Sequence, residues 1–323
     1  MKAQDTSRSS FDVPILVLAF NRPDHLRHVL EAVRAVDPQS LYVAFDGPRR
    51  GNQEDQTLID ECVALVHQQA WSNKPKLLRR EVNLGCGQAV SSALDWFFGQ
   101  EAVGIILEDD IVPTPEFFPF CRELLMRFES DERVCAISGW NAWPDGIREK
   151  QSYRFSEFTP VWGWATWARS WRRYQFTLAP NVDRHLKGGD KSGFDTRRAV
   201  REFWTRAIRT VEGGRVDTWA LQWSINQVAR GDLCAVSNRN LVQNIGFGNA
   251  ATHTVNAPRI ELAPTDLDWP LEHSDVFWHT EADTWIYRHQ HQVSRFRAQL
   301  SPLRLRVRSA ISLFRAKLSD VRN

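Results

Sequence analysis

The sequence lacks a long apolar run, a cysteine pair and a strong charge of either sign. Its first apolar stretch, residues 13–20, follows a polar start; it is too short to span a membrane and lacks the pattern of a secretory signal. The five cysteines are odd in number, widely spaced and never form a CxxC pair, which argues against a zinc site and a disulfide framework. These absences predict a cytoplasmic protein.

The formal net charge of +2 is too small to indicate nucleic-acid binding, so we expect no nucleic-acid partner. The charge is unevenly placed, because residues 295–323 carry eight Lys and Arg against the single acid Asp320. Apolar side chains alternate with these basic ones. The segment fits two interpretations equally: a solvated or oligomer-contacting helix, or a helix on an anionic membrane that would hold the protein peripherally at the inner face.

Short apolar runs alternate with helical patterns through the first 138 residues. Behind Pro23, for example, Leu26, Val29, Leu30 and Val33 recur at helical spacing. This alternation predicts an α/β fold with a largely parallel sheet and helices on both faces. Strands are predicted at residues 15–20, 41–45, 103–107 and 134–138, with a shorter candidate at 77–82.

The chain after Gly139 is less regular. It is rich in tryptophan between Trp140 and Trp223, and indole rings suit both core packing and stacking on sugar rings. One strong helical pattern covers residues 200–211, and residues 240–275 are predicted to be loop.

Three consecutive acids, Glu108, Asp109 and Asp110, directly follow the strand predicted at 103–107. Ligands of open parallel sheets bind at the carboxyl ends of the strands, so the position suits a site. Adjacent carboxylates are costly to bury without a cation. The triplet is therefore either a solvated turn or a site for Mg²⁺ or Mn²⁺ shared with a nucleoside diphosphate, and we favour the metal site.

Six segments of the chain follow one another in an order that resembles a known family. They are similar to the GT-A glycosyltransferases related to N-acetylglucosaminyltransferase I, and more closely to the bacterial hemolytic-protein-like nucleotide-diphospho-sugar transferases. A seventh stretch, NLVQNIGFG at 240–248 followed by THT at 252–254, resembles the bacterial group. The six segments are ILVLAFNRP at 15–23, VAFD at 43–46, NLG at 83–85, EDD at 108–110, AISGWN at 136–141 and WGW at 162–164.

The resemblance implies a GT-A fold, which is a Rossmann-like, mostly parallel sheet with helices on both faces and a less regular acceptor-side half. Residues 1–140 would bind the nucleotide sugar, residues 141–290 would bind the acceptor within the same domain, and residues 291–323 would form a basic amphipathic tail. The implied activity is metal-dependent transfer of a sugar from a nucleotide-sugar donor to a glycan or lipid-linked acceptor, with inversion, as in polysaccharide biosynthesis.

Position by position, the resemblance implies roles for individual residues. Arg22 and Asp46 would hold the nucleotide, Asp46 through its base, and Asp110 would be the direct metal ligand. Glu108 and Asp109 would contact ribose, donor sugar or metal-bound water. The remaining implied contacts are Asn83 and Gly85 near the donor and Trp162 and Trp164 beside the acceptor.

Several of these residues also have ordinary structural explanations. Arg22, at a helix start beside Pro23, suits a negatively charged donor, although without the matching motif it would be interpreted as a surface arginine. Asp46 is also typical of a turn, and the glycines of residues 83–87 are also typical of a loop. His253 is either a metal or phosphate contact or a structural histidine.

An inverting transfer needs a base for the acceptor hydroxyl, and a carboxylate usually serves. The related eukaryotic enzymes carry this Asp in a short Trp-rich segment, and here VDTWALQW at 216–223 has Asp217 as its only acid. An alignment to these enzymes that matches Trp219 instead places Ala220, which cannot act as a base, at the position of the catalytic Asp. Asp217 also suits the N-cap of a helix before Trp219, so both roles stay open. The next candidates for the base are Glu202 and Asp195.

Three other functions agree with parts of the sequence. A sugar nucleotidyltransferase shares this sheet but would show a Gly-rich basic loop after the first strand, where this chain has NRPD at 21–24. A catalytically inactive carbohydrate-binding or scaffold protein also stays open, because Ala220 in the base position would leave the protein without a catalytic base. A Rossmann dehydrogenase is disfavoured because no GxGxxG follows the first strand.

Overall fold

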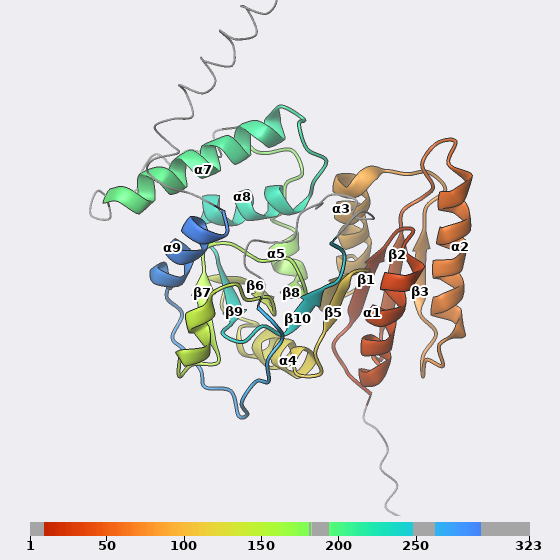
Figure 1. Cartoon of the computed structure of the whole chain (residues 1–323), viewed down its shortest axis with the longest axis horizontal. Helices are drawn as coiled ribbons and strands as arrows, with labels where there is room; N and C mark the ends of the chain where they lie inside the picture. The colour runs from red at the N-terminus through yellow and green to blue at the C-terminus, as the bar shows by residue number, and fades with distance from the viewer. Residues whose placement is uncertain (1–9, 181, 183–193, 248–261, 292–323) are drawn as a thin grey trace, which may run out of the picture.

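The computed structural model describes residues 10–180, 182, 194–247 and 262–291. An eight-stranded sheet runs through this part of the chain in the order β3-β2-β1-β4-β8-β6-β9-β7 (Figure 1). Both sequence halves, before and after residue 140, contribute strands to it. The α/β fold with a mostly parallel sheet, predicted from the alternating pattern, is confirmed.

Four neighbouring strands at one side of the sheet are parallel, and all of them were predicted. Each of the first two is buried along its whole length, as expected for strands covered on both faces. These strands are β1 (Ile15–Ala19), β2 (Leu41–Phe45), β3 (Lys76–Arg79) and β4 (Val103–Glu108).

The other side of the sheet is mixed. Its first strand, β8 (Trp164–Trp167), runs antiparallel to both β4 and β6 (Val134–Ser138). Beyond β6 lie the parallel β9 (Leu233–Ser237) and the antiparallel β7 (Tyr153–Ser156). Because β8 is reversed, the segment that precedes it reaches the edge where β4 and β6 end, and Gly139 N–H donates to Gly163 O over 3.0 Å.

Helices cover both faces of the sheet, as predicted. Alternate residues of β1 point to opposite faces, so Val17 packs with one layer of helices and Leu18 with the other. The first layer consists of α1 (Pro23–Val36), α2 (Gln53–Gln68) and α4 (Phe117–Arg127). The second consists of α3 (Gly85–Phe98), α5 (Ala168–Trp171) and α8 (Ala220–Arg230).

A third apolar cluster joins three helices of the second half. Trp204, Ile225 and Ile286 contribute to it from α7 (Phe194–Glu212), α8 and α9 (Thr280–His289). Figure 1 shows these helices gathered at one side, away from α1 and α2. The helix predicted around residues 200–211 is therefore confirmed as part of α7. None of the helices in the described ranges is long and apolar enough to cross a bilayer.

Two short strands form a separate ladder next to the acid triplet. β5 (Ile111–Pro113) pairs antiparallel with β10 (Val242–Asn244), and Ile245 N–H donates to Asp110 O over 2.9 Å. The prediction of a continuous loop over residues 240–275 was wrong for β10. Three-residue strands are too short to produce a readable apolar period, and this one is stabilised by a partner far away in the chain.

Candidate functional site

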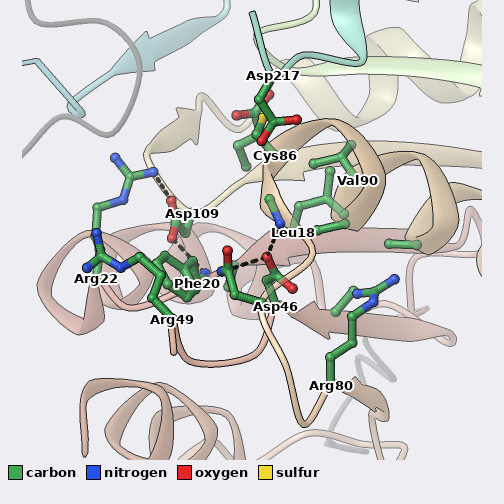
Figure 2. A pocket seen from close by; sticks show the side chains of 17 residues that line it. Leu18, Phe20, Arg22, Asp46, Arg49, Arg80, Cys86, Val90, Asp109 and Asp217 are labelled. Carbon is green, nitrogen blue, oxygen red and sulfur yellow. Dashed lines mark hydrogen bonds and ion pairs between the residues drawn. The ribbon is translucent and has the colours of Figure 1, made fainter. Parts of the chain in front are cut away.

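A cavity of about 230 Å³ lies at the carboxyl ends of β1, β2 and β4 and beside the first turn of α3 (Figure 2). This is the edge of the sheet at which the sequence predicted a site. Of the predicted site residues, Arg22, Asp46, Asn83, Gly85, Glu108, Asp109 and Asp217 line the cavity. The other lining residues are Leu18, Ala19, Phe20, Ala44, Arg49, Arg80, Cys86, Ala89, Val90 and Ala93.

Arg22 forms ion pairs with two acids of the triplet. Its guanidinium bonds Asp109, and its Nη1 lies 2.9 Å from Asp110 Oδ2. The backbone N–H of Phe20 also donates to Asp109, over 3.2 Å. The Arg22 side chain is 17% exposed and those of the two acids only 4% and 13%, so all three groups are largely shielded from water. With so little water nearby, the Coulomb attraction between the guanidinium and the acids is stronger than in a surface pair, which offsets the cost of burying these charges.

The electrostatics of the triplet follow from this burial. Burial, and then the charges of Asp110 and Asp109, raise the pKa of Glu108. Burial likewise raises the pKa of Asp109, although Arg22 opposes the shift. One guanidinium thus stands against three neighbouring acids. A further cation beside these acids would favour their charged forms and lower their pKa values again.

The oxygen donors of the triplet fit Mg²⁺ or Mn²⁺. Within the described ranges, no three side chains of His, Cys, Asp or Glu come together as a complete metal cage. Mg²⁺ keeps several waters and is usually held by one or two carboxylates together with substrate phosphates, so a complete cage is not required. Asp110, the predicted metal ligand, is not among the residues that line the cavity, but it follows Asp109 and pairs with Arg22 through one oxygen, Oδ2.

Asp46, at the end of β2, organises the loop that leads into α3. Its carboxylate accepts hydrogen bonds from the backbone N–H groups of Gly47, Leu84 and Gly85, at 2.9 to 3.2 Å, and from Asn83 Nδ2 at 2.9 Å. Burial raises the pKa of Asp46, and the backbone donors oppose that shift. Both carboxylate oxygens are therefore already engaged by the loop, which positions Asn83 and Gly85 at the cavity.

Asp217 binds the first turn of α3 from the other half of the chain. Its Oδ1 accepts the backbone N–H of Gly87 over 2.8 Å. Gly85 has a φ of +78°, and a Cβ at Gly87 would lie 2.6 Å from Asp217 Oδ1. Both glycines thus make room for the carboxylate. The alternative role of Asp217 as the cap of the following helix was wrong, since α8 has no side-chain cap bond at its N-terminus.

The two predicted acceptor tryptophans lie outside the cavity lining. Trp164 is fully buried, with ring centroids 5.6 Å from Trp219 and 5.3 Å from Trp223, so it belongs to the core beneath the site. Trp162 is half-buried and contacts Trp140 and Phe247 edge-on, at 5.0 and 5.6 Å. Of the two, only Trp162 is partly exposed.

Two cavity arginines were not singled out in the sequence. Arg49 is held by Asp55, whose Oδ2 and Oδ1 accept from Arg49 Nε and Nη2 over 2.7 Å, while Asn21 Nδ2 also donates to Asp55. Arg80 directly follows β3. A cation directly after a strand would have indicated a site residue, because ligands bind where parallel strands end. The predicted strand ran from residue 77 to 82, so Arg80 was placed inside the strand and was not considered.

The remaining candidates lie elsewhere. Glu202 is on α7 and does not line the cavity. Asp195 is on the same helix, with a side chain outside the description. His253 and the basic segment at 295–323 lie outside the described residues.

No family model matches the sequence. Among solved structures, the chain is similar to glucosyl-3-phosphoglycerate synthase from Mycobacterium tuberculosis in complex with Mn²⁺, UDP and glucosyl-3-phosphoglycerate, at 14% identity and a TM-score of 0.30. The match covers 49% of this chain and 57% of the synthase, so it spans just over half of that protein's length.

Two further similar structures are 4-diphosphocytidyl-2C-methyl-D-erythritol synthase from Anaerococcus prevotii and the inositol-1-phosphate CTP transferase from T. maritima. The first is 11% identical over 61% of this chain and 83% of the other, and the second 8% identical over 71% and 85%. Both have a TM-score of 0.33. At these scores the similarity assigns neither a family nor a reaction, and the site itself carries the functional argument.

Proposed function

We propose that the protein is a nucleotide-sugar-dependent glycosyltransferase of the GT-A type, which moves a sugar to a glycan or lipid-linked acceptor with inversion. In this proposal residues 1–140 bind the donor and residues 141–290 bind the acceptor. The tail at 291–323 holds the enzyme at the inner face of an anionic membrane.

One observation carries the proposal: a single cavity holds a cation, a set of acids and a carboxylate from the opposite half of the chain. Arg22 follows β1, Glu108 and Asp109 lie at the end of β4, and Asp217 contacts the first turn of α3; these four residues line the cavity, and Asp110 pairs with Arg22 beside it. A nucleoside diphosphate needs cationic and N–H groups at one end, and sugar transfer needs a proton acceptor beside the diphosphate. The cavity provides both within one connected space.

The chain's own residues divide the work of donor binding. Arg22 binds the diphosphate, and Asn83 and Gly85 line the path of the donor beside the first turn of α3. Asp110 is the metal ligand, with Glu108 and Asp109 beside it. A bound Mg²⁺ or Mn²⁺ supplies positive charge that stabilises the leaving diphosphate.

In the transfer, Asp217 accepts a proton. The acceptor hydroxyl oxygen forms a bond to the anomeric carbon, the bond from that carbon to the diphosphate oxygen breaks, and its electron pair leaves with the diphosphate. The hydroxyl proton passes to the Asp217 carboxylate. A single displacement of this kind inverts the configuration at the anomeric carbon. The exposure of Asp217 at the cavity supports this role, since an acceptor can reach it from solvent.

The half-buried Trp162 is the proposed acceptor contact, because an indole face stacks well on a sugar ring. Trp164 supports the site from the core and has no contact with acceptor in this proposal. Asp46 acts through the loop that it organises, instead of reading the base directly.

The alternative with most support is a sugar nucleotidyltransferase, which binds a nucleotide in a similar cavity. The segment between β1 and α1 argues against it, since it holds Asn21 and Arg22 where such an enzyme needs several backbone N–H groups of a Gly-rich loop. An inactive scaffold would keep the cavity without turnover.

A donor screen tests the proposal. UDP-, GDP- and CMP-sugars are added to the full chain with and without Mn²⁺, and both the shift in Tm and donor hydrolysis are measured. We expect one nucleotide sugar to raise Tm and to be hydrolysed only with metal. Stabilisation without hydrolysis would favour the scaffold. Pyrophosphate formation from a nucleoside triphosphate and a sugar phosphate would instead identify a nucleotidyltransferase.

A further inference from the structure

The proposed function leaves no role for the segment NLVQNIGFG at 240–248, of which the structure describes residues 240–247. In the fold this segment lies beside the acid triplet. Its strand β10 pairs with β5, which begins directly after Asp110, and Ile245 N–H extends the ladder by donating to Asp110 O over 2.9 Å. The backbone of the segment therefore runs alongside the backbone of the predicted metal ligand.

Gly246 lies directly against the side chain of Asp110. Gly246 is buried, and the three atoms nearest to a Cβ at this position would be Oδ2, Cγ and Cβ of Asp110, with Cγ only 2.7 Å away. The backbone of Gly246 is outside the left-handed region, so its conformation does not require glycine. The missing side chain instead leaves space for the carboxylate.

The Asp110 carboxylate is enclosed between Gly246 and Arg22. Its Oδ2, which a Cβ at Gly246 would overlap, is the oxygen that lies 2.9 Å from Arg22 Nη1. The Asp110 side chain is only 13% exposed, so it has little room to turn away from either neighbour. The backbone at Gly246 thus limits the directions in which this carboxylate can point.

The segment around Gly246 is held by contacts of its own. Asn244 Oδ1 accepts the N–H of Gly246 over 2.8 Å. Phe247 packs edge-on against Trp162, with ring centroids 5.6 Å apart. These contacts join residues of the second half of the chain, so the support for Asp110 is fixed independently of the triplet. Groups that orient a metal ligand in this way also tune the affinity for the metal.

We infer that Gly246 is a positioning residue, which seats the Asp110 carboxylate beside Arg22 in the orientation that binds a divalent cation. The inference rests on the proposed function, because it concerns the metal ligand of the same site. It also gives the segment at 240–247 a task in that site: the second half of the chain orients an acid that the first half supplies.

The test replaces Gly246 by Ala in the full-length chain. Calorimetry measures the Kd of UDP, GDP, ADP and CDP with and without Mn²⁺, and the ratio of the two Kd values gives the metal effect for each nucleotide. Gln243→Ala is the matched control, because Gln243 lies on β10 but is exposed. The Tm is measured for Gly246→Ala, for Asp110→Ala and for the double variant.

We expect Mn²⁺ to tighten the binding of at least one nucleotide to the wild type, and Gly246→Ala to reduce that metal effect about tenfold or more. The metal-free Kd should change little, because Arg22 and the cavity lining stay in place. Gln243→Ala should keep the wild-type metal effect.

The Tm values test whether Gly246 acts through Asp110. Gly246→Ala should lower Tm by roughly 2–8 °C, because an added methyl group overpacks the contact. Most of this loss should disappear in the Asp110→Ala background, where the overlapping carboxylate atoms are absent. If Gly246→Ala alone does not fold, the double variant should still fold.

Three results would overturn the inference. Equal losses of Tm in the two backgrounds, or a double variant that does not fold, would show that Gly246 does not act on Asp110. Equal weakening of nucleotide binding with and without Mn²⁺ would show that Gly246 supports the whole cavity. An unchanged metal effect in Gly246→Ala would show that it does not orient the ligand.

The proposed function fails in a different way. If the wild type binds no nucleotide, or binds with no metal effect, the metal-dependent site is refuted. The Tm comparison would still decide whether Gly246 seats Asp110, which separates the two claims.

Discussion

The carboxylate of Asp217 accepts a hydrogen bond from the backbone N–H of Gly87, 2.8 Å away and 130 residues earlier in the chain. The contact satisfies an N–H group of the first turn of α3, which has no side-chain cap of its own. It also fixes one of the two carboxylate oxygens, Oδ1. The cap role that the sequence placed on the helix after Asp217 thus falls on α3 instead, and the proposed role as base concerns the same carboxylate.

The first prediction separates these roles with Asp217→Asn. Asn keeps the hydrogen bond to Gly87 N–H but cannot take a proton, so Tm should stay near wild type while sugar transfer falls by roughly 10² to 10⁴-fold. Turnover and Tm are measured alongside Asp268→Asn, a fully exposed control. Wild-type turnover in Asp217→Asn would move the search for the base to Glu202 and Asp195.

Gly87→Ala probes the same contact from the other side. The new Cβ would lie 2.6 Å from Asp217 Oδ1 and force the carboxylate to shift, so transfer should slow while the donor Kd changes little. Adding Asp217→Asn to this variant should slow transfer no further than Asp217→Asn alone, because both changes act on one group.

The control for Gly87→Ala is Gly99→Ala at the other end of α3, where a Cβ meets nothing closer than 3.1 Å. It should keep wild-type turnover. Additive losses in the double variant would show that Gly87 acts on something other than Asp217.

Asp110→Asn tests the metal site. The amide keeps the size of the side chain but loses the charge that would hold a divalent cation against the diphosphate. The shift in Tm produced by donor should no longer depend on Mn²⁺, whereas Asp24→Asn, an exposed acid in the first turn of α1, should retain that dependence. If Asp110→Asn keeps metal-dependent donor binding and turnover at the wild-type level, the triplet is an ordinary turn and not a metal site.

The pH dependence of stability should reveal the Asp55 network. The hydrogen bond from Arg49 lowers the pKa of Asp55 from 3.8 to about 2, so its stabilisation is fully present above pH 3.8 and is lost as pH falls toward 2. Asp55→Asn should lower Tm by roughly 2–4 °C at neutral pH, a modest effect because Arg49 is 55% exposed. The gap between wild type and variant should close on acidification, and a gap independent of pH would contradict the ion-pair account.

Deletion of residues 295–323 tests the basic tail. Eight basic side chains among apolar ones should bind anionic vesicles, so the shortened chain should cosediment less with them while donor hydrolysis stays largely intact. Neutral vesicles serve as the control. Equal sedimentation of the two chains would remove the membrane role and leave a solvated or oligomer-contacting segment.

The sequence was sufficient for the regular parts of the fold. The strands from β1 to β4 and the helices between them were predictable, because apolar residues at strand and helical periods are imposed by local geometry and burial. The site edge was predictable for the same reason: three acids that follow an apolar strand must lie where parallel strands end. The contact between Arg22 and those acids joins two distant segments, but one segment follows β1 and the other follows β4, and these strands are neighbours in the sheet.

Contacts between distant segments could not be read from the sequence. No local spacing indicates that Asp217 reaches Gly87, or that Asp46 gives both oxygens to the loop at residues 83–85. Trp162 and Trp164 have the same chemistry two positions apart, and only the path of β8 decides that one is half-buried and the other enclosed. The β5–β10 ladder was missed because each strand needs the other in order to form.

The reversed direction of β8 determines which segments can be varied at the carboxyl edge of the sheet. In an all-parallel sheet, only segments that follow strands reach the ligand-binding edge, but here residues 157–163 reach it by preceding one. They meet the segment after β6, and buried hydrogen bonds from Asn141 to Asn238 O and from Asn240 to Val242 O fasten the neighbouring turns. Libraries that vary the surface around Trp162 while keeping Trp164 and these asparagines would change what the edge recognises without disturbing the frame that supports it.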